Sequence, residues 1–218
     1  MEAMMPCDAS GMAEIHRFFK SSFGEGGDLV GRVRQGDAAH ADRVGAHLHA
    51  LSRSLHAHHE FEDERMWDPL VQRAPGCTLH VDRMRQQHAE MLLHLEALDA
   101  ALPAWRSSGR ASEADPVLEA LVGINAALAV HLPDEEGNVV PVMEEVFVQK
   151  VMDDASAHGR RATPRGYAFP MLGQILAAQP DGGDEWLRKH LPPPVRWVWR
   201  GFGRRRYESY RRELLESS

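Results

Sequence analysis

Six polar side chains occupy positions where the helices of a bundle would normally carry apolar ones. They are four histidines and two glutamates: His16, His58, Glu62, His88, His131 and Glu135. A buried carboxylate without a basic partner is costly, so it either takes up a proton or binds a cation. Imidazoles and carboxylates without thiolates suit iron, manganese or zinc. The residue types therefore predict a metal site in the protein interior.

The spacing of these residues indicates how many ions they could hold. His58 precedes Glu62 by four residues, and His131 precedes Glu135 by four, so each pair lies on one face of a helix. Glutamates and histidines from facing helices are the setting of di-iron carboxylate sites. Four terminal imidazoles and two bridging carboxylates would fill about eight of the roughly twelve positions around two octahedral ions. A bridging oxygen species would fill about two more, which leaves about two for dioxygen, peroxide or nitric oxide.

The elements that must position these residues are helices. Apolar residues recur at steps of three and four, and the six polar residues replace members of these apolar stripes. Alternation typical of strands is scarce. We therefore expect an all-α fold whose four long helices cover residues 9–23, 38–73, 79–106 and 115–149.

Capping residues and prolines indicate where the helices begin and end. Asp37 is the expected N-cap of the second helix, and Asp115 followed by Pro116 is the expected start of the fourth. Pro69 and Pro141 are expected to bend or end their helices just past the candidate site, and Pro133 to add a kink.

The order of these motifs resembles that of a known family, the hemerythrin-like or HHE cation-binding domain. The resemblance covers roughly residues 8–150, and its carriers are HRFF from His16, HHEFEDE from His58, QQHAEML around His88 and HLPDEEGNVVP from His131. The tail, LPPPVRWVWRGFGRRRYESYRREL, resembles the C-terminal extension of an actinobacterial branch of that family. The resemblance implies an up-down-up-down four-helix bundle around two non-haem iron ions joined by an oxo or hydroxo bridge. We expect the bundle in residues 1–155 and a helical extension packed on it in residues 156–218.

The chain departs from the family pattern at one position. Oxygen-carrying hemerythrins have a second histidine four residues after the one that corresponds to His88, and this chain has Leu92 there. The departure puts reversible dioxygen carriage in doubt and leaves one iron more open, unless another residue substitutes. The last acid is also ambiguous: Glu135 fits the apolar stripe, and Glu136 fits the spacing of the oxygen carriers.

The remaining histidines and acids near these motifs are expected outside the centre. His47, His49, His56 and His59 lie off the predicted core face of the second helix, and His94 lies nearly opposite His88. A ligating histidine usually donates its second ring N–H to an acceptor. We expect that role, or simple solvation, for Asp63, Glu64 and Glu136.

Composition narrows the class of protein. A formal net charge of -7 argues against a general nucleic-acid binder. Two cysteines, Cys7 and Cys77, are too few for a disulfide framework and are expected to be free thiols. We identify no signal peptide and expect no membrane span, which favours a cytoplasmic protein.

The tail combines arginines with aromatic residues. This mixture could contact an anionic membrane or nucleic acid, but we favour aromatic rings docked on the bundle and arginines paired with its acids. The aromatic residues are Trp197, Trp199, Phe202, Tyr207 and Tyr210. The apolar segment 167–178 is expected to form a short helix that covers part of the bundle.

Three functions fit these features. The first is a non-haem di-iron protein that binds or reduces dioxygen, peroxide or nitric oxide. The second is a di-iron oxidase or oxygenase that acts on a small organic substrate, and the third is a regulator without catalysis that responds to metal or redox state through its tail. The sequence leaves open whether the protein is an enzyme; if it is, a di-iron oxidoreductase is expected. It also leaves open the oligomeric state and the native metal.

Overall fold

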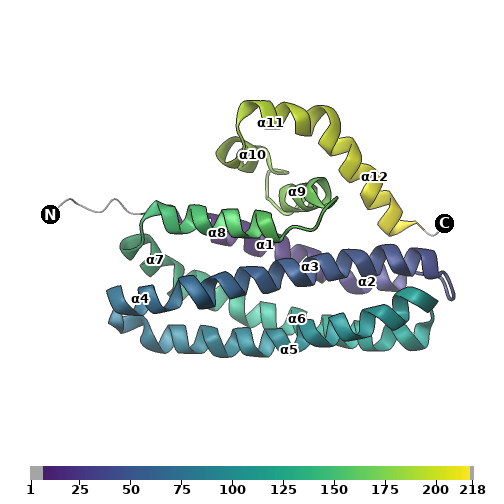
Figure 1. The fold of residues 1–218 in the computed structure, drawn as a ribbon, viewed down its shortest axis with the longest axis horizontal. Coiled ribbons are helices and arrows are strands. Elements are labelled where there is room, and N and C mark those ends of the chain that lie inside the picture. Colours follow the sequence, from purple (N-terminus) through teal and green to yellow (C-terminus); the bar gives the residue numbers. More distant parts are fainter. Residues whose placement is uncertain (1–6, 217–218) are drawn as a thin grey trace.

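The computed structural model describes residues 7–216, which form helices and no strand (Figure 1). The bundle consists of α1 (Gly11–Gly24) with its short continuation α2 (Gly26–Gly31), α3 (Ala38–Arg65), α5 (Thr78–Ser108) and α6 (Ala111–Asn138). The expected all-α bundle with further C-terminal helices is confirmed. Residues 1–6, which belong to the segment where no signal peptide is identified, and residues 217–218 lie outside the described part.

Short connections make sequential helices neighbours. α3 packs on α5 and α5 on α6, while α1 contacts both α3 and α6 and closes the bundle. At the turn between α5 and α6, Gly109 adopts a left-handed conformation with φ 61°, which glycine tolerates better than other residues. A β-carbon at Gly109 would also lie 2.7 Å from the carbonyl carbon of Asp37, so this turn requires glycine twice over.

The two glutamate-bearing helices are both interrupted just past the candidate site. α3 ends at Arg65 and α4 (Trp67–Arg73) follows; α6 ends at Asn138 and α7 (Val140–Val146) follows. Pro69 and Pro141 lie inside the second member of each pair. A proline lacks the N–H group and clashes with the carbonyl four residues earlier, so the predicted interruptions are confirmed. A 3-10 turn, Pro75–Cys77, then leads into α5.

The start of α3 agrees with the sequence prediction, and the start of α6 does not. Asp37 caps α3, because its Oδ1 accepts a hydrogen bond of 2.9 Å from the His40 backbone N–H. The expected start of α6 at Asp115 is wrong: α6 begins at Ala111 and contains Pro116. Pro116 is tolerated in the second turn because it leaves only the carbonyl of exposed Ser112 without a helical donor, and water can reach that carbonyl.

The apolar interior consists of two clusters. The larger fills the bundle from Phe19 and Leu55 to the α5–α6 turn. The smaller joins α4 and α7 to the beginning of α5, and includes Met66, Trp67 and Val139. Both cysteines are buried free thiols, as expected. The six polar residues of the candidate site lie in a layer between these clusters. They therefore interrupt the apolar core as well as the apolar stripes of the individual helices.

One stretch, Ala111–Val146, is long and apolar enough to cross a membrane by length and composition alone. It packs along α5 and carries His131 and Glu135 in the bundle interior. The core helix of a soluble protein passes the same test, so this stretch is weak evidence for a span.

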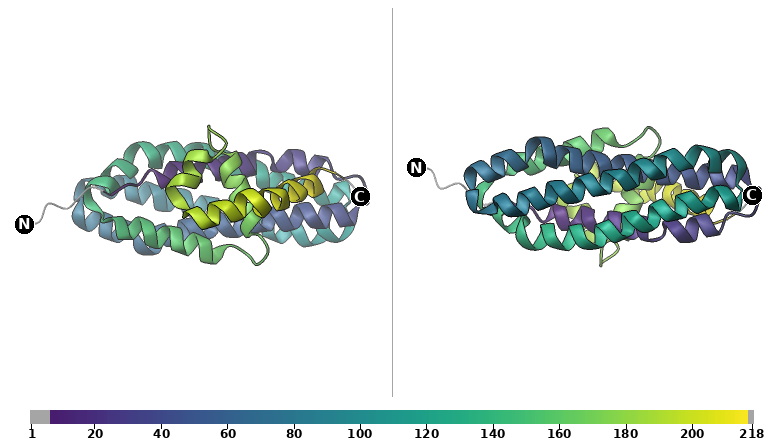
Figure 2. Two further views of the ribbon diagram at one scale, coloured as in Figure 1. Left: turned by 90° about the horizontal axis from the view of Figure 1, so that it is seen from above. Right: turned by 90° about the horizontal axis from the view of Figure 1, so that it is seen from below.

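Residues after α7 form a second layer over one face of the bundle (Figure 2). α8 (Gln149–Ala162) lies along α3, and the expected apolar helix is α9 (Ala168–Ala177), which contacts α1. The chain continues through α10 (Asp184–His190), α11 (Pro193–Val198), a π-helical turn (Trp199–Gly203, η2) and α12 (Arg204–Leu215).

Apolar and polar contacts both attach this layer to the bundle. Met171 and Leu214 are part of the larger core cluster. The Tyr210 hydroxyl and Nδ1 of His47 form a hydrogen bond of 2.8 Å, and Arg211 forms two hydrogen bonds with Glu25, of 2.6 and 2.8 Å. The expectation that His47 lies off the core face is therefore wrong: the tail covers that side of α3 and buries it.

The aromatic residues of the tail do not all dock. Trp199 is buried among residues of the tail, whereas Trp197 and Phe202 are 75% and 59% exposed. The favoured arrangement therefore holds for Tyr210 and Arg211, and it is wrong for Trp197 and Phe202.

Replacing Tyr210 with Phe tests how the tail is held. The variant keeps the ring but removes the hydroxyl that is hydrogen-bonded to buried His47, so the free energy of unfolding should fall by about 1–3 kcal/mol in urea titrations. Glu208→Gln is the control, because its exposed pair with Arg204 should contribute less than about 1 kcal/mol. Equal stability of Tyr210→Phe and the wild-type protein would contradict the assignment.

Candidate metal centre

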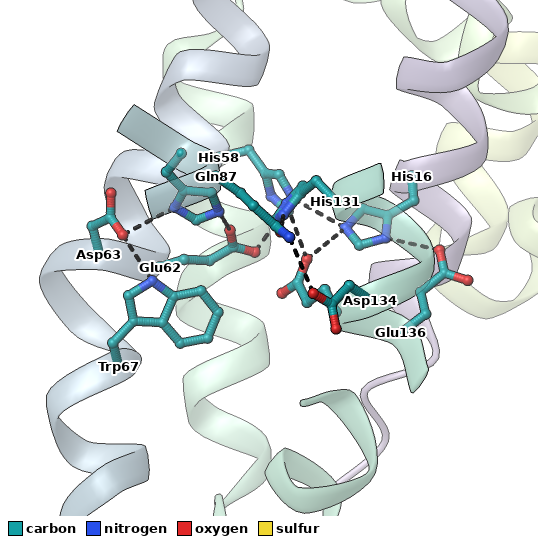
Figure 3. A network of polar contacts seen from close by, with 11 residues as sticks. His16, His58, Glu62, Asp63, Trp67, Gln87, His131, Asp134 and Glu136 are labelled. Carbon is teal, nitrogen blue, oxygen red and sulfur yellow. Dashed lines mark hydrogen bonds and ion pairs between the residues drawn. The ribbon is translucent and has the colours of Figure 1, made fainter. Parts of the chain in front are cut away.

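The structure brings all six predicted residues together in the polar layer of the core. Figure 3 labels His16, His58, Glu62 and His131. α1 contributes His16, α3 contributes His58 and Glu62, α5 contributes His88, and α6 contributes His131 and Glu135. Five of the six are buried, and the side chain of His58 is 14% exposed. The i, i+4 spacing places the acid of each HxxxE pair beside its own histidine, as the helical geometry predicts.

Each carboxylate lies between histidines of different helices. Oε1 of Glu62 is 3.3 Å from Nε2 of His58, and its Oε2 is 3.5 Å from Nε2 of His88. Oε2 of Glu135 is 3.3 Å from Nε2 of His16 and 3.5 Å from Nε2 of His131. Two ligand atoms roughly 2.1 Å from one ion and at right angles to each other would be about 3 Å apart. These spacings therefore suit donors that share a cation.

Most of the atoms that face this centre lack hydrogen-bond partners among the described residues. Both carboxylate oxygens of Glu62 and of Glu135, and Nε2 of His88 and of His131, are buried and unsatisfied. Nearly all buried polar atoms in proteins are hydrogen-bonded, so this concentration calls for another partner. A cation would satisfy all of these lone pairs at once, and the donor set fits one.

Acids outside the centre orient two of the imidazoles. Nδ1 of His16 donates to Glu136 over 2.8 Å, and Nδ1 of His88 donates to Asp63 over 2.9 Å. Asp63 also accepts a 2.7 Å hydrogen bond from the Trp67 indole N–H. In Figure 3, Asp63 and Glu136 lie at opposite sides of the cluster. Each bond orients its ring so that Nε2 faces the centre.

His131 is oriented by a longer relay. Its Nδ1 donates to the amide oxygen of Gln87 over 3.1 Å. The Gln87 amide nitrogen donates to Asp134 over 3.0 Å, and Arg83 pairs with Asp134 at 2.8 Å. A neutral amide thus separates this imidazole from the acid.

Glu135 and Glu136 occupy different environments. The Glu135 side chain is completely buried within the cluster, whereas that of Glu136 is 40% exposed and lies behind His16. The geometry therefore favours Glu135 over Glu136 as the acid that faces the centre, and it gives Glu136 the outer position also considered for it.

Burial sets the protonation of the histidines. It lowers the pKa of His131 to about 4 and that of His58 well below its usual value, with neighbouring charges as smaller contributions. Both rings are therefore neutral near pH 7, the form that binds a metal. Burial, reinforced by the charges of Glu135 and Asp63, raises the pKa of Glu62 well above its usual value.

His16 and Glu135 form a coupled pair. Burial lowers the pKa of His16, but the contacts with Glu135 and Glu136 outweigh burial and raise it to about 9. Burial raises the pKa of Glu135, but His16 outweighs this effect and holds it at about 2. A proton shared in this way partly offsets the charge of one carboxylate and leaves Glu62 without such a partner.

The sequence analysis misplaced two residues near the centre. His59 was expected off the core face, but it is buried and stacks on His88. Leu92 was expected on the stripe; it is only partly buried, and Met91 takes the buried position. The only indication in the sequence was that His59 directly follows His58. Counting in steps of three and four along one stripe places His59 on an adjacent face of the helix, outside the core. His49 and His94 do lie outside the cluster: His49 pairs with Asp99, and His94 faces Gly123 of α6.

Residues 11–145 match the family described as the Hemerythrin HHE cation binding domain. The match covers more than half of the chain, so the chain belongs to this family of metal-binding helical domains. Searches of curated proteins and of solved structures found no match to it.

Glu62→Leu tests whether the carboxylate is a cost to the metal-free fold. After dialysis against a chelator, the variant should unfold with about 1–3 kcal/mol more free energy than the wild-type protein, because an unpaired buried acid is removed. Glu64→Leu, on the exposed side of the same helix, should change the value by less than about 0.5 kcal/mol. Urea titration measures both, and a destabilised Glu62→Leu would show that Glu62 is satisfied without a cation.

Proposed function

We propose that this protein is a non-haem di-iron protein that binds or reduces small oxygen or nitrogen species: dioxygen, peroxide or nitric oxide. The observation that carries the proposal is the position of the Glu62 carboxylate. Its two oxygens face histidines of different helices, at 3.3 and 3.5 Å, which is the arrangement expected of a carboxylate that spans two ions. Family membership supports cation binding, and the thiolate-free donor set supports iron.

The six residues divide between two positions. His16 and His58 lie at one side, where their Nε2 atoms are 3.3 Å apart. His88 and His131 lie at the other, with ring centroids 4.8 Å apart. Glu62 and Glu135 reach both sides and would bridge, while the four histidines would be terminal ligands. Two iron ions held there would supply redox equivalents and an open position for a small ligand.

The protein contributes orientation and exclusion of water. The Phe19 ring lies 5.4 Å from that of His58, and the Trp67 ring lies 5.8 Å from that of His88. Both side chains are buried, so they close the layer toward the two apolar clusters. A dry, pre-oriented centre favours small ligands over bulk water as the groups that complete it.

Metal analysis of the aerobically purified full-length chain tests the centre. We expect about two irons per chain and an oxo-bridge band in the ultraviolet–visible spectrum. His131→Ala should lose both, whereas His56→Ala, at an exposed position of α3, should retain both. Stoichiometric zinc or manganese in place of iron would refute the redox assignment.

The ligand is tested separately on the iron-loaded protein. The protein is prepared without oxygen and mixed with peroxide, dioxygen or nitric oxide in separate experiments. At least one of the three ligands should change its absorption spectrum. A fully loaded protein whose spectrum responds to none of them would overturn the proposed function while leaving the metal centre intact.

Asp63→Asn tests the outer support of His88. The amide is a weaker acceptor for the His88 N–H and the Trp67 indole, so iron affinity should fall about 10–100-fold. Competition with a chelator measures this loss. Asp68→Asn is the control, since Asp68 lies one turn beyond the centre and pairs with Arg85 at the surface. Equal affinities for the two variants would exclude the role given to Asp63.

A further inference from the structure

His59 occupies a place that no part of the HxxxE pattern explains. Its side chain is buried, with 5% exposure, beside His88 and His131. The ring stacks on that of His88 with centroids 4.1 Å apart and planes inclined by 15°, and it meets the ring of His131 edge-on at 5.1 Å. It is therefore the third imidazole on the α5–α6 side of the polar layer.

The ring nitrogen that His59 directs inward lacks a partner. Its Nε2 is buried without a hydrogen bond among the described residues, and stacking on His88 cannot supply one. Ligand atoms of His59, His88 and His131 all lie within 4.8 Å of one another, and a second such group joins His59 to His58 and Glu62. A core histidine kept only for packing would be expected to bond through this nitrogen.

The packing of α3 explains how two consecutive histidines both face the interior. Successive residues of a helix point about 100° apart, so His58 and His59 cannot face the same neighbour. α3 contacts α1 on one side and α5 on the other. His58 lies against His16 and Phe19 of α1, and His59 lies against His88 of α5.

We propose that His59 is a further protein ligand of the centre, which it would bind through Nε2. This assignment rests on the proposed di-iron function. His59 would take the role left vacant by Leu92, which is only partly buried. His59, His88 and His131 then supply three imidazoles on the α5–α6 side, and His16 and His58 supply two on the α1–α3 side.

His59→Phe separates ligation from packing. Phenylalanine keeps a ring to stack on His88 and removes the nitrogen. Loss of an outer-shell partner costs about 10–100-fold in metal affinity, so loss of a direct ligand should weaken one of the two ferrous ions by more than about 100-fold. Anaerobic ferrous titration with a competing chelator should then give about one tightly held iron per chain, against about two for the wild-type protein and for His56→Ala.

A second variant distinguishes loss of a ligand from loss of the fold. His59→Ala leaves a cavity that free imidazole can enter, and added imidazole should restore the second iron and its absorption band. Pyrrole has a similar ring but no basic nitrogen, so it should not restore them. Thermal unfolding of the chelator-treated proteins reports whether each variant is folded before metal is added.

The outcomes distinguish this inference from the proposed function. Two tightly held irons in His59→Phe, or failure of imidazole to rescue folded His59→Ala, would assign His59 to the core and overturn the inference alone. A wild-type protein that holds no iron would overturn both. Loss of one iron in His59→Phe with rescue of His59→Ala by imidazole alone would establish the ligand.

Discussion

The free-energy cost of removing Glu62 and Glu135 from water is the constraint on which this structure depends. Both carboxylates lie in the middle of a helical bundle, and within residues 7–216 no lysine or arginine enters the layer that surrounds them. Burial keeps His58 and His131 neutral, so they offer lone pairs, whereas His16 is held in a form that carries positive charge. An arrangement of acceptors that face acceptors costs free energy until a proton or a cation joins them, so the stability of the fold depends on what the site holds.

The outer layer follows from the same constraint. Further acids lie where they are partly exposed, so that their charge costs little free energy of desolvation. Each one influences the centre through an imidazole ring: Glu136 lies behind His16 and Asp63 behind His88. His131 has the amide of Gln87 instead. Because a carboxylate raises the basicity of an imidazole more than an amide does, the histidines of the centre differ as ligands even though their inner faces look alike. The histidines therefore differ as ligands because their hydrogen-bond partners outside the centre differ.

Much of this could be predicted from the sequence, for a physical reason. His58 with Glu62 and His131 with Glu135 follow from helical spacing alone, and the breaks before Pro69 and Pro141 follow from the chemistry of proline. His59 could not be placed, because counting along one stripe assumes one partner face, and α3 is buried on two. His47 was missed for a related reason: the covering helix α12 comes from the distant tail. Whether Trp197 or Trp199 would be buried depended on a π-helical turn that no spacing rule indicates.

The polar layer also separates the two apolar clusters, one toward the α5–α6 turn and one around α4 and α7. The two clusters are separate at the level of the six residues, so the continuous helices α3, α5 and α6 and the polar layer join the ends of the bundle. A cation bound there as proposed would add to this connection, and folding would then be more cooperative when the metal is present. When the ion is scarce, we expect the half containing α4 and α7, with the smaller apolar cluster, to open to proteases first.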